Sequence, residues 1–263
     1  MPSFSILSLN TFGIPFFLSY WRIIRLAAEL SRLAPTVLCL QEIQQNAYLP
    51  LLRDGLVDYP HLAYSRNRFA PKGGLVTAAM GNGSSLFHPF PQRGKWLSIG
   101  FADWALNKGV LVTDLEVAGS RVIVMNTHLQ ANYLGDWSPS NTQTQIQLEQ
   151  VKFLAELACS QSADAWVFAC GDFNFPRQTP PYDLLMKESG LTDALTDDPR
   201  PTYQPFPLIP SKWEMSLDYF LYRKPEGEIT GITADIRPLQ NAAGRTNFQR
   251  FLTDHCALIL KIG

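Results

Sequence analysis

Carboxylate and amide side chains occur in this sequence where several apolar segments end. The carboxylates are Glu42, Asp172 and Asp254, and the amides are Asn10 and Asn174. A single Asn or Asp after a strand is usually a turn residue, so the interpretation depends on the joint pattern. Hard cations such as Mg²⁺ bind oxygen ligands, usually carboxylates together with water and substrate phosphate. The pattern therefore predicts a divalent-cation site.

Two histidines lie at junctions of the same kind. His128 ends the run VIVMNTH, with Asn126 on the same face of that strand, and His255 begins the run HCALIL. Asp218 lies inside the apolar segment MSLDYFLY. A histidine can act as a general base or donate a hydrogen bond to developing phosphoryl charge. A lone histidine beside apolar residues is usually a core residue, but together with the carboxylates these histidines predict phosphate-ester chemistry.

The segments that must position these side chains alternate between short apolar strands and amphipathic helices. Helical spacing of apolar residues predicts helices over residues 21–33, 142–159 and 182–188. Prolines between residues 199 and 210 predict a long irregular loop. No Gly/Ser-rich linker divides the sequence, so we expect a single catalytic domain over residues 1–263. Strands are expected at residues 4–9, 36–40, 74–80, 95–100, 110–117, 122–127, 165–170, 217–222, 228–236 and 255–260.

The composition is that of a globular protein with little net charge. Of 263 residues, 46% are hydrophobic and 17% are charged, and the formal net charge is −1. Intrinsic disorder needs low hydrophobicity and high net charge, so it is excluded. The lack of a global positive field weighs against a dedicated DNA-binding protein, although a nuclease needs only a local basic patch. Arg66, Arg68 and Lys72, together with Arg93 and Lys95, are the candidates for such a patch, with ordinary loop charges as the alternative.

The cysteines and the N-terminal segment bear on where the protein works. Each of the four cysteines lies in an apolar run, which predicts buried free thiols in a reducing compartment. Residues 1–21 carry no charged side chain, but polar residues and prolines interrupt them and no basic segment precedes them. We therefore expect neither a signal peptide nor a transmembrane segment. The expectation is a cytoplasmic protein with at most peripheral membrane contact.

Six short segments in a fixed order resemble the endonuclease/exonuclease/phosphatase superfamily. They are LSLN ending at Asn10, QE at Glu42, NTH at His128, GDFN at Asn174, LDY at Tyr219 and TDH at His255. The resemblance extends over residues 4–260 and implies an α/β (α+β) fold, a two-layer αββα sandwich of mainly antiparallel sheets flanked by helices. It also implies hydrolysis of a phosphate ester with Mg²⁺, for which Mn²⁺ can substitute. We expect a monomer.

Carried over to this sequence, the resemblance implies a role for each polar residue. His255 would be the general base or the main charge partner of the phosphate, with Asp218 fixing its tautomer, and whether His255 or Asp172 takes the proton of the attacking water stays open. Residues 138–150 lack an arginine that the superfamily often carries there, which Arg177 would replace unless it is a solvated loop residue. The implied catalytic residues are His255, Asp218, His128 and Asp172; the implied metal ligands are Glu42, Asn10, Asp254 and Asp172. The implied phosphate-binding residues are Asn174, His128, Asn126 and Lys108, with a surface turn as the alternative for Lys108.

Within the superfamily, the segment LNTFGIPFF is similar to the N-terminal motif of neutral sphingomyelinases. The preferred substrate is therefore a lipid phosphodiester, cleaved by in-line attack of water. The alternatives are a DNA or RNA endonuclease or exonuclease, another phosphoesterase, and a catalytically inactive phosphate-binding module. Aromatic residues near Asn10 either make transient contact with a membrane surface or pack the first helix onto the sheet. They are Phe12, Phe16, Phe17, Tyr20 and Trp21, with a second apolar rim at Phe206, Leu208 and Trp213.

Overall fold

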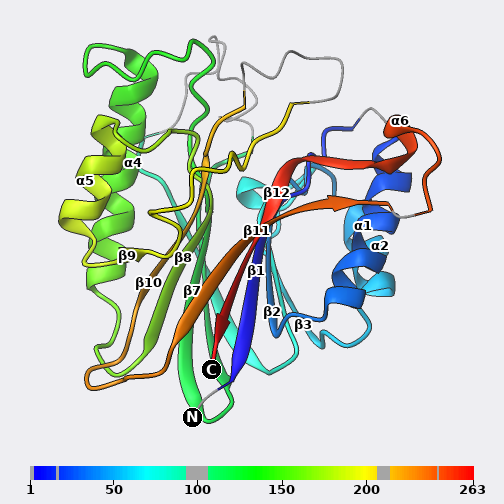
Figure 1. Cartoon of the computed structure of the whole chain (residues 1–263), viewed down its shortest axis with the longest axis horizontal. Coiled ribbons are helices and arrows are strands. Elements are labelled where there is room, and N and C mark those ends of the chain that lie inside the picture. The colour runs from blue at the N-terminus through cyan, green and yellow to red at the C-terminus, as the bar shows by residue number, and fades with distance from the viewer. Residues whose placement is uncertain (1–2, 16–17, 93–105, 206–213, 242) are drawn as a thin grey trace.

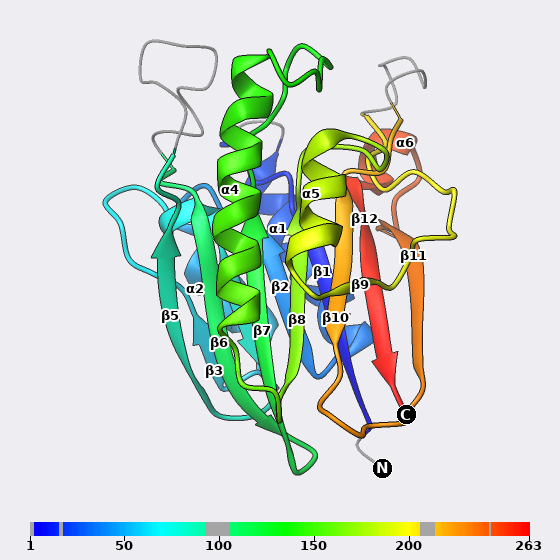
Figure 2. The ribbon, with the colours of Figure 1, turned by 90° about the vertical axis from the view of Figure 1, so that its left-hand side faces the viewer.

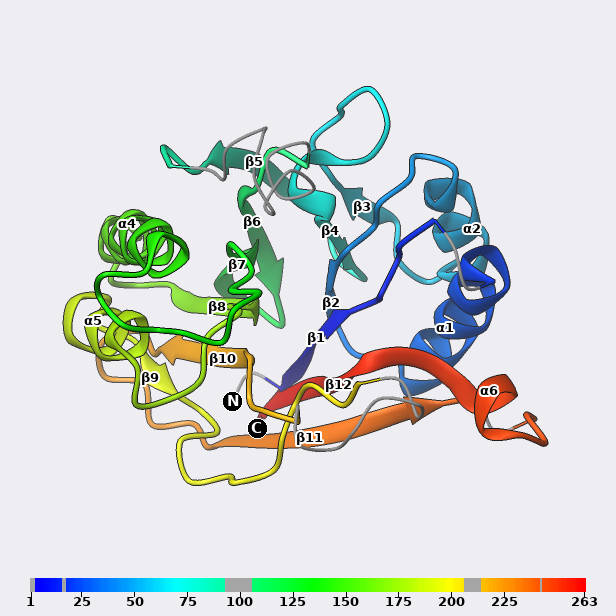
Figure 3. The ribbon, with the colours of Figure 1, turned by 90° about the horizontal axis from the view of Figure 1, so that it is seen from above.

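The chain folds into two β-sheets packed face to face, with helices on both outer surfaces (Figures 1 and 3). The computed structural model describes residues 3–15, 18–92, 106–205, 214–241 and 243–263. Helices α1 (Ser19–Leu33) and α2 (Tyr48–Gly55) lie outside one sheet. Helices α4 (Thr142–Cys159) and α5 (Pro180–Glu188) lie side by side across the other, as Figure 2 shows. This arrangement confirms the predicted αββα sandwich.

Each sheet has six strands. The first contains, in spatial order, β11 (Ile232–Gln240), β12 (Phe251–Ile262), β1 (Phe4–Asn10), β2 (Val37–Gln41), β4 (Val76–Ala79) and β3 (His61–Ala63). The second contains β5 (Gly83–Pro89), β6 (Gly109–Val117), β7 (Ser120–His128), β8 (Trp166–Asp172), β10 (Asp218–Arg223) and β9 (Thr192–Asp193). Only β1–β2 and β7–β8 are parallel among these pairs. Since α1 connects the first parallel pair and α4 the second, each pair is a βαβ crossover.

The alternation of side chains along the strands sorts the core into layers and positions the polar residues. Ile6 of β1 and Phe168 of β8 pack between the sheets, whereas Leu9 of β1 lies in the layer beneath α1 and α2. A third apolar layer lies between the second sheet and α4. Asn10 and Asp172 continue the inward-facing alternation beyond the apolar residues of their strands. Their side chains therefore enter the space between the sheets at the same end of the sandwich.

Strand β12 departs from regular pairing where it approaches this end. Its register with β11 shifts between Pro238 and Gln240, so that β12 carries extra residues there. Consecutive residues His255 and Cys256 both reach the space between the sheets, because His255 contacts Asp218 and Cys256 lies in the apolar layer. Regular alternation would place them on opposite faces. The bulge therefore brings His255 to the polar end of the sandwich.

Several elements agree with the sequence prediction and others do not. The helix over residues 142–159 is confirmed with the same bounds, whereas α2, β3 and β5 were not predicted. Strand β12 begins four residues earlier than predicted, at Phe251, after the short α6 (Asn247–Arg250); a 3₁₀ turn at Lys72–Gly74 precedes β4. The predicted strand at residues 95–100 lies outside the described residues. Three cysteines are buried as predicted, but Cys159 is exposed at the end of α4.

Candidate active site

The side-chain amide of Asn10 connects the ends of three strands. Its Nδ2 donates to Glu42 Oε1 at 3.2 Å and to Asp172 Oδ2 at 3.0 Å. Its Oδ1 accepts from the backbone N–H of Phe12 at 3.0 Å. Glu42 directly follows β2 and Asp172 ends β8, so both sheets contribute to this contact. Three of the predicted metal ligands are thus brought together.

The backbone around Glu42 is held in an unusual conformation by close packing. Glu42 has a φ of +58°, a left-handed conformation that costs a residue with a side chain about 1–3 kcal/mol. A Cβ added to Gly13 would lie 1.9 Å from the Glu42 carbonyl oxygen, so only glycine fits there. On the other side, the N–H of Ile43 donates to Gly74 O at 2.9 Å. These contacts direct the Glu42 carboxylate toward Asn10.

His255 and Asp218 form a buried hydrogen-bonded pair. His255 Nδ1 lies 2.8 Å from Asp218 Oδ2, which also accepts from the Thr202 hydroxyl at 2.6 Å. The other imidazole nitrogen, Nε2, lies 3.8 Å from Asp172 Oδ2 and 4.0 Å from Asp254 Oδ1. Burial alone would lower the pKa of His255, but Asp218 and the other two carboxylates outweigh it and hold the pKa well above its ordinary value. The imidazole is therefore held as an imidazolium by its carboxylate neighbours.

Asp172 and Asp254 are buried carboxylates beside this imidazole. Burial raises the pKa of Asp172 to about 6, although His255 opposes the shift. Burial likewise raises the pKa of Asp254 to about 6. Burial also raises the pKa of Glu42. The pKa of each of these three carboxyls lies above its ordinary value, so an added positive charge would stabilise their ionised form.

His128 and Lys108 lie on the second-sheet side of the same cluster. His128 Nε2 is 3.6 Å from Asp172 Oδ2. Burial, together with the charges of Lys108 and His255, lowers the pKa of His128 well below its ordinary value, so this imidazole is neutral. Lys108 is 1% exposed and its Nζ donates to the carbonyl of Leu129 at 2.6 Å. The surface-turn interpretation of Lys108 is therefore wrong.

The two remaining asparagines of the prediction have different surroundings. Asn174 Nδ2 donates to Leu129 O at 3.1 Å, and its backbone N–H donates to Asp172 Oδ1 at 2.9 Å, so it lies at the cluster. Asn126 is fully buried between the sheets. Its Oδ1 accepts from Gln41 Nε2 at 2.8 Å and its Nδ2 donates to Val76 O at 3.0 Å. Asn126 joins the two sheets, and these bonds would have to break before it could contact a phosphate.

Other sequence expectations near the site are corrected by the contacts. Arg177 is neither solvated nor at the cluster, because its Nε donates to Asp193 Oδ2 at 2.9 Å and its guanidinium lies 5.1 Å from the centroid of the Tyr219 ring. Phe12 packs edge-on against Phe251 with ring centroids 5.9 Å apart. Tyr20 is half exposed. The predicted apolar contacts of Phe16, Phe17, Phe206, Leu208 and Trp213 concern residues outside the described part of the chain.

Sequence reasoning missed residues that hold the cluster from behind. Thr202 supports Asp218, and its Oγ1 accepts the backbone N–H groups of Leu217 and Asp218 at 2.9 and 3.0 Å. Arg22 of α1 is buried and donates to backbone carbonyls near Asn10. Arg22 is spaced four and eight residues from the apolar Leu26 and Leu30, and this helical spacing is the signal that could have indicated its burial. Thr202 lies in a proline-rich loop and carried no signal.

The donor chemistry of the cluster fits a hard divalent cation. Glu42 Oε2 and Asp254 Oδ1 are buried and accept no hydrogen bond. A buried carboxylate oxygen without a donor is costly unless a cation or water satisfies it. Among the described residues, the compact group of possible ligands is Asp172, Asp218 and His255, but the last two are bonded to each other. The two unsatisfied oxygens, together with the carboxylate of Asp172, are therefore the better match for a cation.

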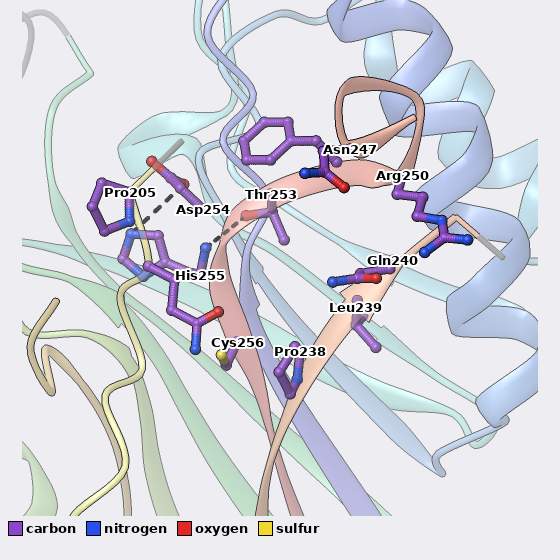
Figure 4. Close-up of a pocket in the computed structure, with 12 residues that line it drawn as sticks. Pro205, Pro238, Leu239, Gln240, Asn247, Arg250, Thr253, Asp254, His255 and Cys256 are labelled. Carbon is purple, nitrogen blue, oxygen red and sulfur yellow. Dashed lines mark hydrogen bonds and ion pairs between the residues drawn. The ribbon is translucent and has the colours of Figure 1, made fainter. Parts of the chain in front are cut away.

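A cavity of about 340 Å³ opens beside His255 and Asp254. Figure 4 shows these two residues on one side of it and Gln240, Asn247 and Arg250 on the other. The residues opposite His255 come from the end of β11 and from α6. A ligand in this cavity would lie beside His255 and Asp254.

The geometry and the order of these residues agree with a match to a known protein family. The model of the Endonuclease/Exonuclease/phosphatase family matches residues 7–255. The chain belongs to this family.

Individual relatives include proteins with different substrates in their names. A Drosophila melanogaster protein that carries the provisional name of neutral sphingomyelinase is 28% identical over 197 residues, which is 74% of this chain but 44% of the relative. The chain thus spans less than half the length of that relative. The structure resembles that of SmcL with a TM-score of 0.81, at 19% identity over 99% of both chains.

Two further structural relatives differ in the substrates that their names indicate. Sphingomyelinase C from Streptomyces griseocarneus has a TM-score of 0.73, at 21% identity over 100% of both chains. D. rerio TDP2 in complex with a single-stranded DNA product has a TM-score of 0.76, at 18% identity over 99% of both chains. At these identities the structural likenesses establish the fold. Within the part of the chain that the structure describes, no helix is long and apolar enough to cross a membrane.

Proposed function

We propose that the protein is a Mg²⁺-dependent phosphodiesterase that hydrolyses a lipid phosphodiester of the sphingomyelin type by in-line attack of water. The observation that carries the proposal is the pairing of a buried His255–Asp218 couple with two unsatisfied carboxylate oxygens, on Glu42 and Asp254. Hydrolysis of a phosphodiester needs positive charge and hydrogen-bond donors around the phosphoryl group. This cluster supplies both at one end of the sandwich.

Each residue of the cluster has a role that its contacts support. Glu42, Asp254 and Asp172 would hold Mg²⁺, which when bound supplies charge stabilisation to the phosphoryl oxygens. Asn10 would join them once its amide turns, so that Oδ1, which accepts from the Phe12 N–H in this structure, faces the cation. His255, held as an imidazolium by Asp218, donates from Nε2 to a phosphoryl oxygen. Asp172 Oδ2, 3.8 Å from that nitrogen, accepts the proton of the attacking water. His128, Asn174 and Lys108 complete the phosphate-binding side.

A lipid substrate is supported by the relatives' names and by exposed apolar residues near the cluster. Leu18 is 59% exposed and Tyr20 49%, at the start of α1, which follows Asn10 in the chain. Tyr133 and Leu134 are 48% and 67% exposed shortly after β7, the strand that ends in His128. Aromatic and aliphatic side chains of this kind favour the interfacial zone of a bilayer. We therefore propose transient contact of a monomer with a membrane surface.

Nucleic acid is the second candidate substrate, favoured by a basic and aromatic segment. Arg68 lies 5.1 Å from the centroid of the exposed Phe69 ring, and Lys72 lies 5.7 Å from that of Phe87. Cations interleaved with aromatic rings are typical of single-strand binding. Arg66 is exposed on the same segment.

A parallel assay separates these candidates. The protein, with Mg²⁺, is supplied with sphingomyelin in mixed micelles and with single-stranded and plasmid DNA, and His255→Ala is the inactive control. Release of phosphocholine with intact DNA supports the lipid proposal. Cleavage of DNA without phosphocholine supports the nuclease and directs attention to Arg66, Arg68 and Lys72. No turnover of any phosphodiester would indicate a phosphate-binding module.

A further inference from the structure

Arg22 is a buried arginine directly behind the cluster, and the reaction outlined above does not use it. It is 3% exposed on the inner face of α1. Its Nη1 donates to Leu252 O at 2.8 Å and to Thr11 O at 3.3 Å, and its Nη2 donates to Phe12 O at 2.6 Å. A buried guanidinium is costly unless its N–H groups are satisfied, and these carbonyls offset that cost.

The three carbonyls belong to the two chain segments that carry candidate metal ligands. Two of them belong to the residues directly after Asn10, at the end of β1. The third precedes Asp254 by two residues, in the irregular start of β12. Arg22 and its β12 partner are 230 positions apart in the sequence. One side chain thus joins segments from the beginning and the end of the chain.

The segment after Asn10 needs such support because its backbone is strained. Phe12 has a φ of +49° and Glu42, which packs against the same loop, has a φ of +58°. Strained conformations persist only where the surroundings fix them. The hydrogen bond from Arg22 to Phe12 O fixes the strained backbone of Phe12 from one side. The guanidinium also lies 5.0 Å from the centroid of the Phe12 ring and 5.9 Å from that of Phe251, so ring stacking fixes the same loop.

The charge of Arg22 acts on the same carboxylates. Burial lowers the pKa of Arg22, and the charges of Asp254 and Glu42 act against that shift. In return, Arg22 favours the ionised form of Asp254, although burial dominates the pKa of that carboxyl.

We propose that Arg22 is a positioning residue of the metal site, which holds the Asn10 and Asp254 segments at the separation at which the carboxylate oxygens of Asp254 and Glu42 bind one divalent cation. The inference rests on the proposed function, because it presupposes a cation at this cluster. An arginine is required because one planar group must reach carbonyls on two segments at once. A lysine keeps the charge but presents a single nitrogen.

The test measures cation binding directly, with Mn²⁺ as the probe and the electron paramagnetic resonance signal of free Mn²⁺ as the readout. Arg22→Lys should weaken Mn²⁺ binding by about 10–100-fold, the usual effect of losing a residue that orients metal ligands. Arg25→Lys, at an exposed position three residues further along the same helix, is the matched control and should bind like the wild type. Glu42→Gln should bind weakly and so locates the signal at this cluster. Circular dichroism verifies that each variant is folded.

The outcomes separate this inference from the proposed function. Wild-type affinity in Arg22→Lys would overturn the positioning role and leave the proposed function intact. No Mn²⁺ binding by the wild type would overturn both. If Arg22→Lys does not fold, Thr253→Val serves instead, because the Thr253 hydroxyl donates to Asn10 O at 2.6 Å and joins the same two segments. Unchanged Mn²⁺ affinity in that variant would overturn the inference.

Discussion

Replacing Asp218 by asparagine tests how the site charges His255. The Asp218 carboxylate oxygen Oδ2 lies 2.8 Å from His255 Nδ1 and accepts from the Thr202 hydroxyl at 2.6 Å. An amide oxygen can accept both bonds, so Asp218→Asn removes the charge while keeping the shape of the side chain. We therefore expect a folded variant in which the imidazole keeps its place and loses its main charge partner.

The expected size of the effect follows from that contact. An opposite charge this close moves a pKa by about 1–3 units, so the pKa of His255 should fall by that amount in Asp218→Asn. If the imidazolium form of His255 stabilises the phosphoryl group, the alkaline limb of the pH–rate profile moves to lower pH by the same about 1–3 units. At a pH above the lowered pKa, kcat/KM should fall by up to about 10–10³-fold, because each pKa unit reduces the imidazolium fraction by at most tenfold.

The assay is the pH dependence of kcat/KM on bis-p-nitrophenyl phosphate with saturating Mg²⁺. Asp235→Asn is the matched control, because Asp235 is an exposed carboxylate whose ion pair, at 3.0 Å, is with Arg200. If the acidic limb of the Asp218→Asn profile shifts instead of the alkaline limb, His255 is the general base that takes the proton of the attacking water. An unchanged profile with nearly wild-type kcat would refute the reasoning.

Three further predictions concern groups around the same cluster. Burial raises the pKa of Asp254 to about 6, so the folded state binds a proton more tightly than the unfolded state does. In EDTA the Tm should therefore rise as the pH falls from about 7.5 to about 5.5, whereas Mg²⁺ should stabilise the protein most at the higher pH. Calorimetry in EDTA that finds the Tm falling as the pH is lowered over this range would contradict this prediction. Lys108→Met removes a buried ammonium that donates to Leu129 O, and kcat/KM should fall about 10–100-fold; full activity would return Lys108 to a structural role. Gly13→Ala places a Cβ 1.9 Å from the Glu42 carbonyl oxygen, and this clash should lower the free energy of unfolding by about 1–3 kcal/mol in urea titrations. An unchanged free energy of unfolding would mean that the loop around Gly13 moves to accommodate the methyl group without cost.

Elements with strong periodicity could be predicted from the sequence, and weakly patterned ones could not. The apolar run AWVFAC predicts a buried strand, and β8 covers nearly the same residues and is buried along its whole length. The 18 residues of α4 match the predicted helix. By contrast, β5 (GSSLFHP) is an edge strand with mostly exposed side chains, so it lacks apolar alternation. In the sequence, Pro50 looks like a helix breaker and so argues against a helix at α2. In the structure it lies in the first turn of α2, where a proline is tolerated.

The candidate site divides in the same way. The residue types at the strand ends predicted that Asn10, Glu42 and Asp172 act together, and the structure places them in contact. The environment of Lys108 and of Arg22 could not be predicted, because it depends on segments far away in the sequence. Lys108 resembles a turn residue between Asn107 and Gly109, yet the fold buries it. The bulge in β12 likewise depends on its pairing with β11 and leaves no mark in the sequence.

The central claim is that this cluster hydrolyses phosphodiesters with a divalent cation, and one measurement tests it most directly. Hydrolysis of bis-p-nitrophenyl phosphate is followed with Mg²⁺, after addition of excess EDTA, and after Mg²⁺ is restored. The account predicts that EDTA abolishes the turnover and that Mg²⁺ restores it. It also predicts that Glu42→Gln shows no turnover at the same Mg²⁺ concentration. Full turnover in excess EDTA, or wild-type turnover by Glu42→Gln, would contradict it.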